Sequence, residues 1–305
     1  MLRKMRRNDC LSISGKEQVL GGSYKEVRLS GYGSIQGALT AEPLKVSGLG
    51  MFDEGVTVSQ LEVSGQATFN HHLEVHEAKV SGLLTAKKNV SCQEKFVVSG
   101  KVKGESRMNI RELTISGLLT ALQELEVGIL KLSGKLSANS LKVENAEISG
   151  MVTITGELCA HVLEIRGMMT ADSVESEVLK VKGRIDCKDM INSEKVEISS
   201  TSGSSFNELG ASDVKICELE PKHGLLSRFS TLCHLFSGTT VVKGNLIEAD
   251  SVYVENARIK KIRGQDIVIG PHCEIEAIEY GGTLVVDSTS TVKQATMQEE
   301  KRCLI

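Results

Sequence analysis

The residue types that most often bind metals or carry catalysis are scattered through this 305-residue sequence. The densest group of histidines is HHLEVH, which holds His71, His72 and His76. If this segment is a strand, His71 and His72 point to opposite faces, and His72 and His76 lie about 13 Å apart at about 3.3 Å per residue. Imidazoles placed in this way cannot share one metal ion as neighbours. The sequence therefore predicts no metal site.

The eight cysteines contain no C-x-x-C pair, and no apolar export signal accompanies the basic N-terminal segment. Isolated cysteines in such a chain indicate reduced thiols in a cytoplasm. Cys187 occupies a repeat position that is held by alanine in other copies, and Cys159 also lies within a repeat. Both thiols are therefore predicted to be inert rather than nucleophilic.

Motifs for other chemistries are missing from the sequence. It contains neither a G-x-x-x-x-G-K-[ST] phosphate loop nor a G-x-S-x-G nucleophile elbow. The acidic residues are spread out, without the paired carboxylates of a glycosidase. A formal net charge of −3 argues against a nucleic-acid partner. These observations predict a protein that is not an enzyme and takes no cofactor.

A short phrase recurs along the chain and indicates its architecture. SGLLTA stands at residues 81–86 and again at 116–121. The ten intervals from Gly15 to Gly183 span 168 residues, a mean of 16.8, and an aliphatic residue always stands two places before the glycine. The aligned glycines are Gly15, Gly31, Gly48, Gly65, Gly82, Gly100, Gly117, Gly134, Gly150, Gly167 and Gly183.

Between the glycines, apolar and polar residues alternate with a period of two, which is typical of strands with one buried face. In residues 133–150, for example, Leu136, Ala138, Leu141 and Val143 alternate with polar residues. Three strands of three to five residues in about 17 residues predict one coil of a parallel β-solenoid, with neighbouring coils about 4.8 Å apart. The glycine is predicted at a corner, where either a positive φ or a close approach between coils excludes a Cβ.

The repeat is interrupted once. Residues 201–238 do not fit it, and their apolar residues after Pro221 recur at helical spacing, which predicts a short amphipathic helix at about 222–236. That helix either packs against the solenoid or binds a partner or membrane surface. The predicted organisation is a basic leader (1–12), about twelve coils (13–200), the insert (201–238), closing coils (239–292) and a flexible tail (293–305).

The closing coils carry a family resemblance. Residues 242–287, VKGNLIEADSVYVENARIKKIRGQDIVIGPHCEIEAIEYGGTLVVD, are similar to the last coils of the bactofilins, the bacterial polymer-forming cytoskeletal proteins. The resemblance implies a right-handed parallel β-helix that assembles end to end without nucleotide and lies against the inner face of the cell membrane. A typical member has one short central domain, whereas this chain has about fifteen coils and an apolar insert.

Two other readings stay open. The segment IGPHCEI (269–275) resembles the coils of hexapeptide-type acyltransferases. The coils of those enzymes, however, repeat strictly every 18 residues. A secreted β-helical adhesin or polysaccharide lyase would need a signal peptide and surface aromatic residues for stacking on sugars, and the sequence offers little of either.

If the protein is a self-assembling scaffold, its predicted partners are further copies of the chain, an anionic membrane surface, and unidentified envelope or motility proteins. No nucleic-acid partner is predicted. Uncapped solenoid ends would template strand pairing. The polymer-end candidates are Leu11, Ile13, Leu284 and Val286. The candidates for partner or membrane contact are Leu2, Arg3, Lys4, Met5, Arg6 and Arg7 in the leader, and Leu225, Leu226, Phe229, Leu232 and Phe236 in the insert.

Overall fold

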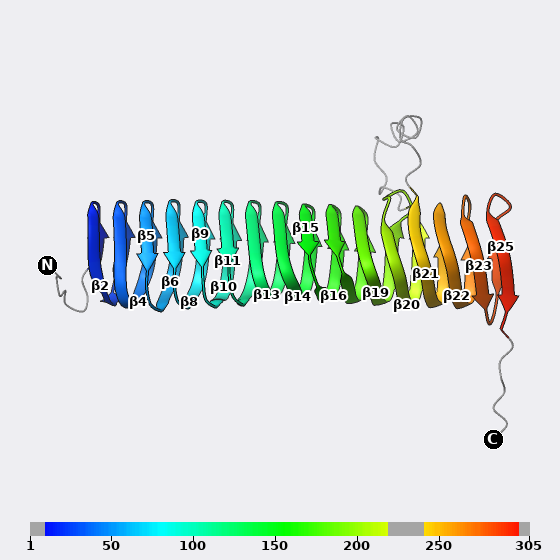
Figure 1. The fold of residues 1–305 in the computed structure, drawn as a ribbon, viewed down its shortest axis with the longest axis horizontal. Helices are drawn as coiled ribbons and strands as arrows, with labels where there is room; N and C mark the ends of the chain where they lie inside the picture. The colour runs from blue at the N-terminus through cyan, green and yellow to red at the C-terminus, as the bar shows by residue number, and fades with distance from the viewer. Residues whose placement is uncertain (1–9, 219–240, 299–305) are drawn as a thin grey trace, which may run out of the picture. The chain divides into compact units, whose positions relative to one another are not determined.

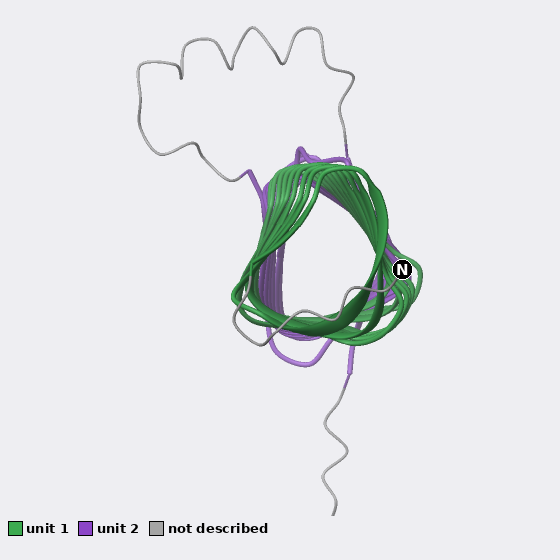
Figure 2. Ribbon diagram, turned by 90° about the vertical axis from the view of Figure 1, so that its left-hand side faces the viewer, with its two compact units in different colours: residues 1–158 green, residues 159–305 purple. Residues whose placement is uncertain are grey.

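The computed structural model describes residues 10–218 and 241–298, and all of their regular elements are strands. The chain divides into two compact units, Met1–Leu158 (unit 1) and Cys159–Ile305 (unit 2), which are coloured separately in Figure 2. In each unit the strands pair in parallel with the strands of the neighbouring coils, as Figure 1 shows. The predicted all-β parallel solenoid is thus confirmed. The predicted helix at 222–236 lies outside the described residues.

Unit 1 holds fifteen strands and the start of a sixteenth. They are β1 (Cys10–Ile13), β2 (Lys16–Tyr24), β3 (Glu26–Leu29), β4 (Tyr32–Val46), β5 (Leu49–Phe52), β6 (Val56–Val63), β7 (Gln66–Phe69), β8 (Leu73–Val80), β9 (Leu83–Ala86), β10 (Val90–Val98), β11 (Lys101–Gly104), β12 (Met108–Ile115), β13 (Leu118–Leu132), β14 (Lys135–Ile148) and β15 (Met151–Ile154).

Strand β16 (Glu157–Ile165) begins in unit 1 and continues into unit 2. The remaining strands of unit 2 are β17 (Met168–Ala171), β18 (Ser173–Val181), β19 (Arg184–Ser199), β20 (Ser205–Cys217), β21 (Val242–Val254), β22 (Ala257–Ile269), β23 (Glu274–Tyr280), β24 (Leu284–Val286) and β25 (Thr291–Met297).

Strand lengths differ from the predicted three to five residues. In most of unit 1, four-residue strands such as β9 alternate with strands of eight or nine residues, and β13 runs for 15 residues. The longer strands arise because parallel pairing continues through a bend, with a register shift such as that between Cys92 and Lys95. Two of the three predicted strands of a coil are therefore joined.

The core is built from stacked columns of aliphatic side chains. The residue two places before each corner glycine is buried throughout, as at Val80 and Ile115, each 0 % exposed. The inward orientation predicted for Leu84, Ala86, Leu119, Ala121, Leu136 and Ala138 is also confirmed, since all are buried. Where the alanine column holds Gly104, the side chain of Met108 fills the space instead. Each coil thus keeps its cross-section filled.

Close approach between coils explains the corner glycines. The described glycines with positive φ are Gly22, Gly37 and Gly203, none of which is a corner glycine. A Cβ added to Gly82, however, would lie 2.0 Å from the carbonyl oxygen of Gly65 in the preceding coil. The backbone N–H groups of Ser81 and Gly82 both donate to the Val63 oxygen, at 2.8 and 3.0 Å. The coils are therefore drawn together where only hydrogen fits.

The segment after residue 200 differs from its predicted boundary. Residues 205–217 form strand β20, which pairs with β19 and β21 as an ordinary coil. Val181 is in register with Ile198, and Cys187 with Phe206, so six residue steps in one coil correspond to eight in the next. Two extra residues in this corner shift the repeat and hid the coil in the sequence. Likewise, β25 extends to Met297, into the predicted flexible tail.

Candidate functional site: the end coils

The first described coil leaves one edge of its backbone open. Strand β1 pairs only with β3, and β2 only with β4, among the described residues. Their other edges therefore carry backbone N–H and C=O groups without a strand partner in the described part of the chain. Such an edge is a template for pairing with another strand.

The predicted end residues of this coil point into the core. Leu11 is 2 % and Ile13 0 % exposed, so neither side chain is presented for contact. Glu17, which sequence reasoning missed, is the notable side chain here. Its side chain is exposed. Glu17 stands two residues after its corner glycine and is in register with Gly33, so it belongs to the column that holds Leu84 and Leu119 in later coils. Aligning the repeats on Gly15 places a carboxylate in that apolar column, and this signal was available in the sequence.

Gly15 also differs from the other corner glycines. A Cβ added there meets nothing within 4 Å, whereas at Gly31 it would lie 2.2 Å from the Gly15 oxygen. Among the described residues, no coil precedes the corner that holds Gly15, so no carbonyl group restricts this glycine. A further coil stacked on this edge in the same register would impose the restriction that Gly31 already has.

The last described coil presents apolar side chains instead. Strand β24 pairs with β22, where Leu284 and Val286 are in register with the buried Ile267 and Ile269. These two predicted end residues therefore continue core columns, yet Leu284 is only half-buried and Val286 is 41 % exposed. Strand β25 pairs only with β23 among the described residues. This end offers both an open edge and a partly uncovered apolar cross-section.

The remaining predicted contact residues lie outside the described residues. They are Leu2, Arg3, Lys4, Met5, Arg6 and Arg7 of the leader, and Leu225, Leu226, Phe229, Leu232 and Phe236 of the insert.

The histidines do not lie as predicted. His71 and His72 stand in the corner between β7 and β8 rather than in a strand, and their Nδ1 atoms are 2.7 Å apart. The prediction that they point to opposite faces is therefore wrong, because a corner does not follow strand alternation. His76 lies within β8, with its Nδ1 3.5 Å from Gln93 Oε1 of the next coil.

The cysteines of the repeat have the environment of core residues. Cys187 is 4 % exposed, and burial raises the pKa of its thiol to about 11. Burial likewise raises the pKa of Cys92 to about 11. Thiols with such pKa values are almost fully protonated at neutral pH and are poor nucleophiles. Cys159 is half-buried.

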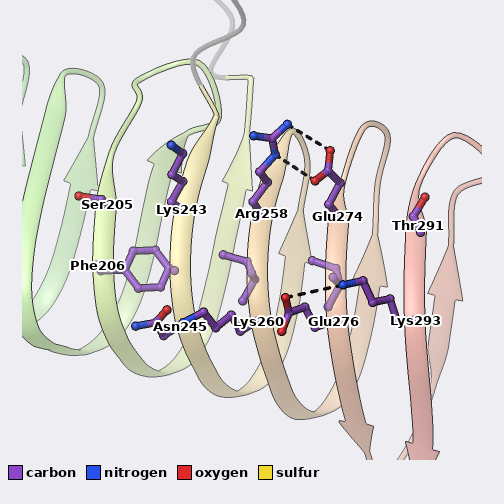
Figure 3. Close-up of a pocket in the computed structure, with 13 residues that line it drawn as sticks. Ser205, Phe206, Lys243, Asn245, Arg258, Lys260, Glu274, Glu276, Thr291 and Lys293 are labelled. Atoms are coloured by element: carbon purple, nitrogen blue, oxygen red, sulfur yellow. Dashed lines mark hydrogen bonds and ion pairs between the residues drawn. The ribbon is translucent and has the colours of Figure 1, made fainter.

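A groove of about 560 Å³ in unit 2 is lined by residues of β20, β21, β22, β23 and β25 (Figure 3). Arg258 pairs with Glu274 at 3.1 Å and Lys293 with Glu276 at 3.8 Å, so most of its charges are satisfied locally. The hydroxyl of its lining residue Ser205 donates to Asp186 Oδ1 at 2.7 Å. Of the six charged side chains that line the groove, only Lys243 and Lys260 form no ion pair with a described residue.

Comparison with known proteins leaves the family open. No family model matches the chain, and no solved structure matches it. It is 31 % identical over 109 residues to the uncharacterized protein YhbE of Bacillus subtilis (strain 168), covering 35 % of this chain and 42 % of YhbE. It is 40 % identical over 52 residues to the uncharacterized protein YhbF of the same strain, covering 17 % of this chain and 22 % of YhbF. The chain thus spans less than half the length of these curated relatives, whose names state no activity.

Within the described residues, no helix has the length and apolar character needed to cross a membrane.

Proposed function

We propose that this protein is a non-enzymatic, bactofilin-like scaffold of the cytoplasm that assembles through its coil ends into polymers without nucleotide. The observation that carries the proposal is the last coil, where Val286 continues a buried column and is nevertheless 41 % exposed beside an open strand edge. Stacking a second copy there would bury apolar surface and pair backbone groups in one step.

The two ends support unequal roles in this assembly. The last coil offers Leu284 and Val286, whereas the first coil offers Glu17 in an apolar column. Covering Glu17 would desolvate a carboxylate, and inward-pointing charges are a known means of blunting a sheet edge. Contact between two C-terminal coils is therefore the stronger joint, and contact through the N-terminal coil is the weaker one.

Negative-stain electron microscopy of the purified chain without nucleotide tests the proposal. Wild type is expected to form filaments, and Val286→Asp is expected to abolish or greatly shorten them. Val162→Asp is a matched control, because Val162 is 38 % exposed and lies in β16, away from the end coils. Circular dichroism should show that both variants keep the β-solenoid.

The N-terminal joint has its own variants. Glu17→Leu should lengthen filaments by removing the desolvation cost, whereas Gly15→Val should shorten them by adding a side chain at the open corner. A wild-type protein that stays monomeric, or forms only discrete trimers, at every concentration would overturn the proposal and favour the acyltransferase reading. Equal filament lengths for Val286→Asp and Val162→Asp would overturn the role of the last coil.

A further inference from the structure

The short strands of unit 1 form a continuous face of parallel strands, seen in Figure 1 at β5, β9, β11 and β15. We call the outward positions one and three residues after each corner glycine the short-strand face. Its members are Lys16, Gln18, Tyr32, Ser34, Leu49, Met51, Gln66, Thr68, Leu83, Thr85, Lys101, Lys103, Leu118, Thr120, Lys135, Ser137, Met151 and Thr153.

The short-strand face holds no aspartate or glutamate, although the chain as a whole is acidic. The long strands of unit 1 are different, because their lysines and arginines alternate with glutamates. Pairs on those strands include Lys45 with Glu62 at 3.6 Å and Lys95 with Glu112 at 3.1 Å. Acidic residues are therefore absent from this side of the coil, so its lysines have no carboxylate neighbour within the face.

Most lysines of this face have no acidic partner. Lys103 pairs with Glu105, which follows strand β11. Lys16, Lys101 and Lys135 form no ion pair with any described residue, and Lys16 Nζ instead lies 5.4 Å from the centroid of the Tyr32 ring. Their charges are left for a partner outside the chain.

Large apolar side chains are exposed on the same face as these lysines. Leu49 is 46 %, Met51 37 % and Met151 43 % exposed, on strands whose outward neighbours are threonines such as Thr68. From Lys16 to Met151 the face runs over eight coil steps, about 38 Å at about 4.8 Å per step. An extended surface that combines lysines, exposed leucine or methionine and a tyrosine fits the interface of an anionic bilayer.

We propose that the short-strand face of unit 1 binds the surface of a membrane that contains anionic lipid. Other occupants fit less well. The long strands of a second copy carry lysines and arginines beside their glutamates, as in the pairs of Lys45 with Glu62 and Lys95 with Glu112, so they offer this face less net negative charge than an anionic leaflet does. A nucleic acid would leave the exposed Leu49 and Met151 without an apolar environment, and the chain carries a net charge of −3.

The expected affinity is low for one copy and rises on assembly. Each lysine near an anionic leaflet contributes about a five-fold increase in binding, so three lysines give about 100-fold. Polymers would multiply this through avidity, and only that amplification depends on the proposed function.

Co-sedimentation with vesicles tests the proposal on the full chain. The probes are vesicles of phosphatidylcholine alone and of phosphatidylcholine mixed with phosphatidylglycerol. Replacing Lys16, Lys101 and Lys135 by glutamine should lower the partition coefficient on the mixed vesicles about 100-fold. The matched control replaces Lys79, Lys131 and Lys142 by glutamine. These exposed lysines also form no ion pair with a described residue, but they lie outside the short-strand face and each is in register with a glutamate of a neighbouring coil.

The control triple variant should bind nearly as well as wild type, and Leu49→Ser with Met151→Ser should weaken binding without a change in net charge. Equal binding by the two lysine triple variants would overturn the proposal. So would a loss of binding seen only when Arg3, Lys4, Arg6 and Arg7 of the leader are replaced.

Two further outcomes separate this proposal from the proposed polymer. If the lysine variants change filament bundling without vesicles but do not change vesicle binding, the short-strand face mediates contacts between copies and the proposal is overturned. If wild type binds vesicles but forms no filaments, the proposed polymer fails and this inference stands.

Discussion

The corners of unit 1 and those of the closing coils in unit 2 solve the same turn in different ways. In unit 1 the Ser-Gly corner repeats from coil to coil, and its glycine is required because the carbonyl oxygen of the previous corner lies about 2 Å from where a Cβ would stand. In the closing coils, the described corners instead use Asn256 (φ 46°) and His272 (φ 60°), which are not glycines.

This difference shows that the repeated glycine is required by the contact between neighbouring coils, and not by the conformation of a single coil. The Ser-Gly corner works only when the next corner is its copy, since each glycine is restricted by its neighbour. The closing corners are held by side chains instead, as when Asn256 Nδ2 donates to the Ser200 oxygen at 3.0 Å. Such corners tolerate variation between neighbouring coils but depend on individual residues.

The largest expected effect is at a stacked corner. Gly82→Val should reduce the free energy of unfolding by at least about 3 kcal/mol, because its Cβ would meet backbone atoms of the previous coil that cannot move aside cheaply. Gly15→Val, the same change at the open corner, should stay within about 0.5 kcal/mol of wild type. Urea denaturation checks both, and equal losses would show that conformational freedom, rather than the contact between coils, requires the glycine.

A smaller effect is expected at the closing corners. Asn256→Ala should cost about 1–2 kcal/mol, since alanine is disfavoured at positive φ and the bond to Ser200 is lost. His272→Gly should be neutral or stabilising by about 1 kcal/mol, because glycine adopts this φ without strain. Thermal unfolding measures both. A destabilising His272→Gly would mean that the imidazole itself holds the corner.

The sequence predicted the parts of the fold that every coil repeats. The inward columns through Val80 and Ile115 are set by alternation and by the copy in the next coil, so both are visible in the chain. Features that occur once were missed, because a periodic pattern averages over them. The two extra residues before Ser205 concealed a whole coil, and the prediction for His71 and His72 failed because strand alternation does not extend into a corner.

The candidate sites were predicted less completely for the same reason. The sequence predicts Leu284 and Val286 as end residues because they lie in the last coil, and the structure shows that Val286 is exposed there. Leu11 and Ile13 also lie at an end but are buried, which a pattern of alternation cannot reveal. Lys16, Lys101 and Lys135 each follow a corner glycine directly, so their shared column was also visible in the repeat. What the sequence could not show is that no described carboxylate pairs with them, because an ion pair depends on side-chain positions in three dimensions.

An intermediate case within unit 1 tests whether side-chain crowding differs from backbone crowding. A Cβ at Gly104 would lie 2.4 Å from Met108 Sδ, a flexible neighbour rather than backbone. Gly104→Ala should therefore cost only about 1 kcal/mol, and Met108→Val in the same chain should recover part of this loss by making room. A double-mutant cycle measures the coupling. Additive losses would show that the methionine does not compensate for the glycine.

The smallest expected effect is the loss of stability at low pH. Its cause differs between the two units, because different interactions lower the pKa of the carboxyl groups concerned. In the last coil, hydrogen bonds from the hydroxyl and N–H of Thr289 lower the pKa of Asp287 below its usual 3.8. In unit 1, the pKa of Glu105 is lowered by its hydrogen bond to, and the charge of, Lys103. A carboxyl with a depressed pKa contributes stability above its unfolded pKa and loses it as the pH falls through the folded value.

Both contributions should therefore be present at neutral pH and fade below about pH 4. High salt should weaken the contribution of Glu105, because it screens the lysine charge at this exposed site, and should leave that of Asp287 nearly unchanged. The prediction for Asp287 is checked by hydrogen exchange of β24 and β25 in acid, at low and high salt, compared between wild type and Asp287→Asn. If the acid sensitivity of the last coil vanishes in salt, Asp287 is held by the nearby charge of His272 rather than by Thr289, and the closing coils follow the same electrostatics as unit 1.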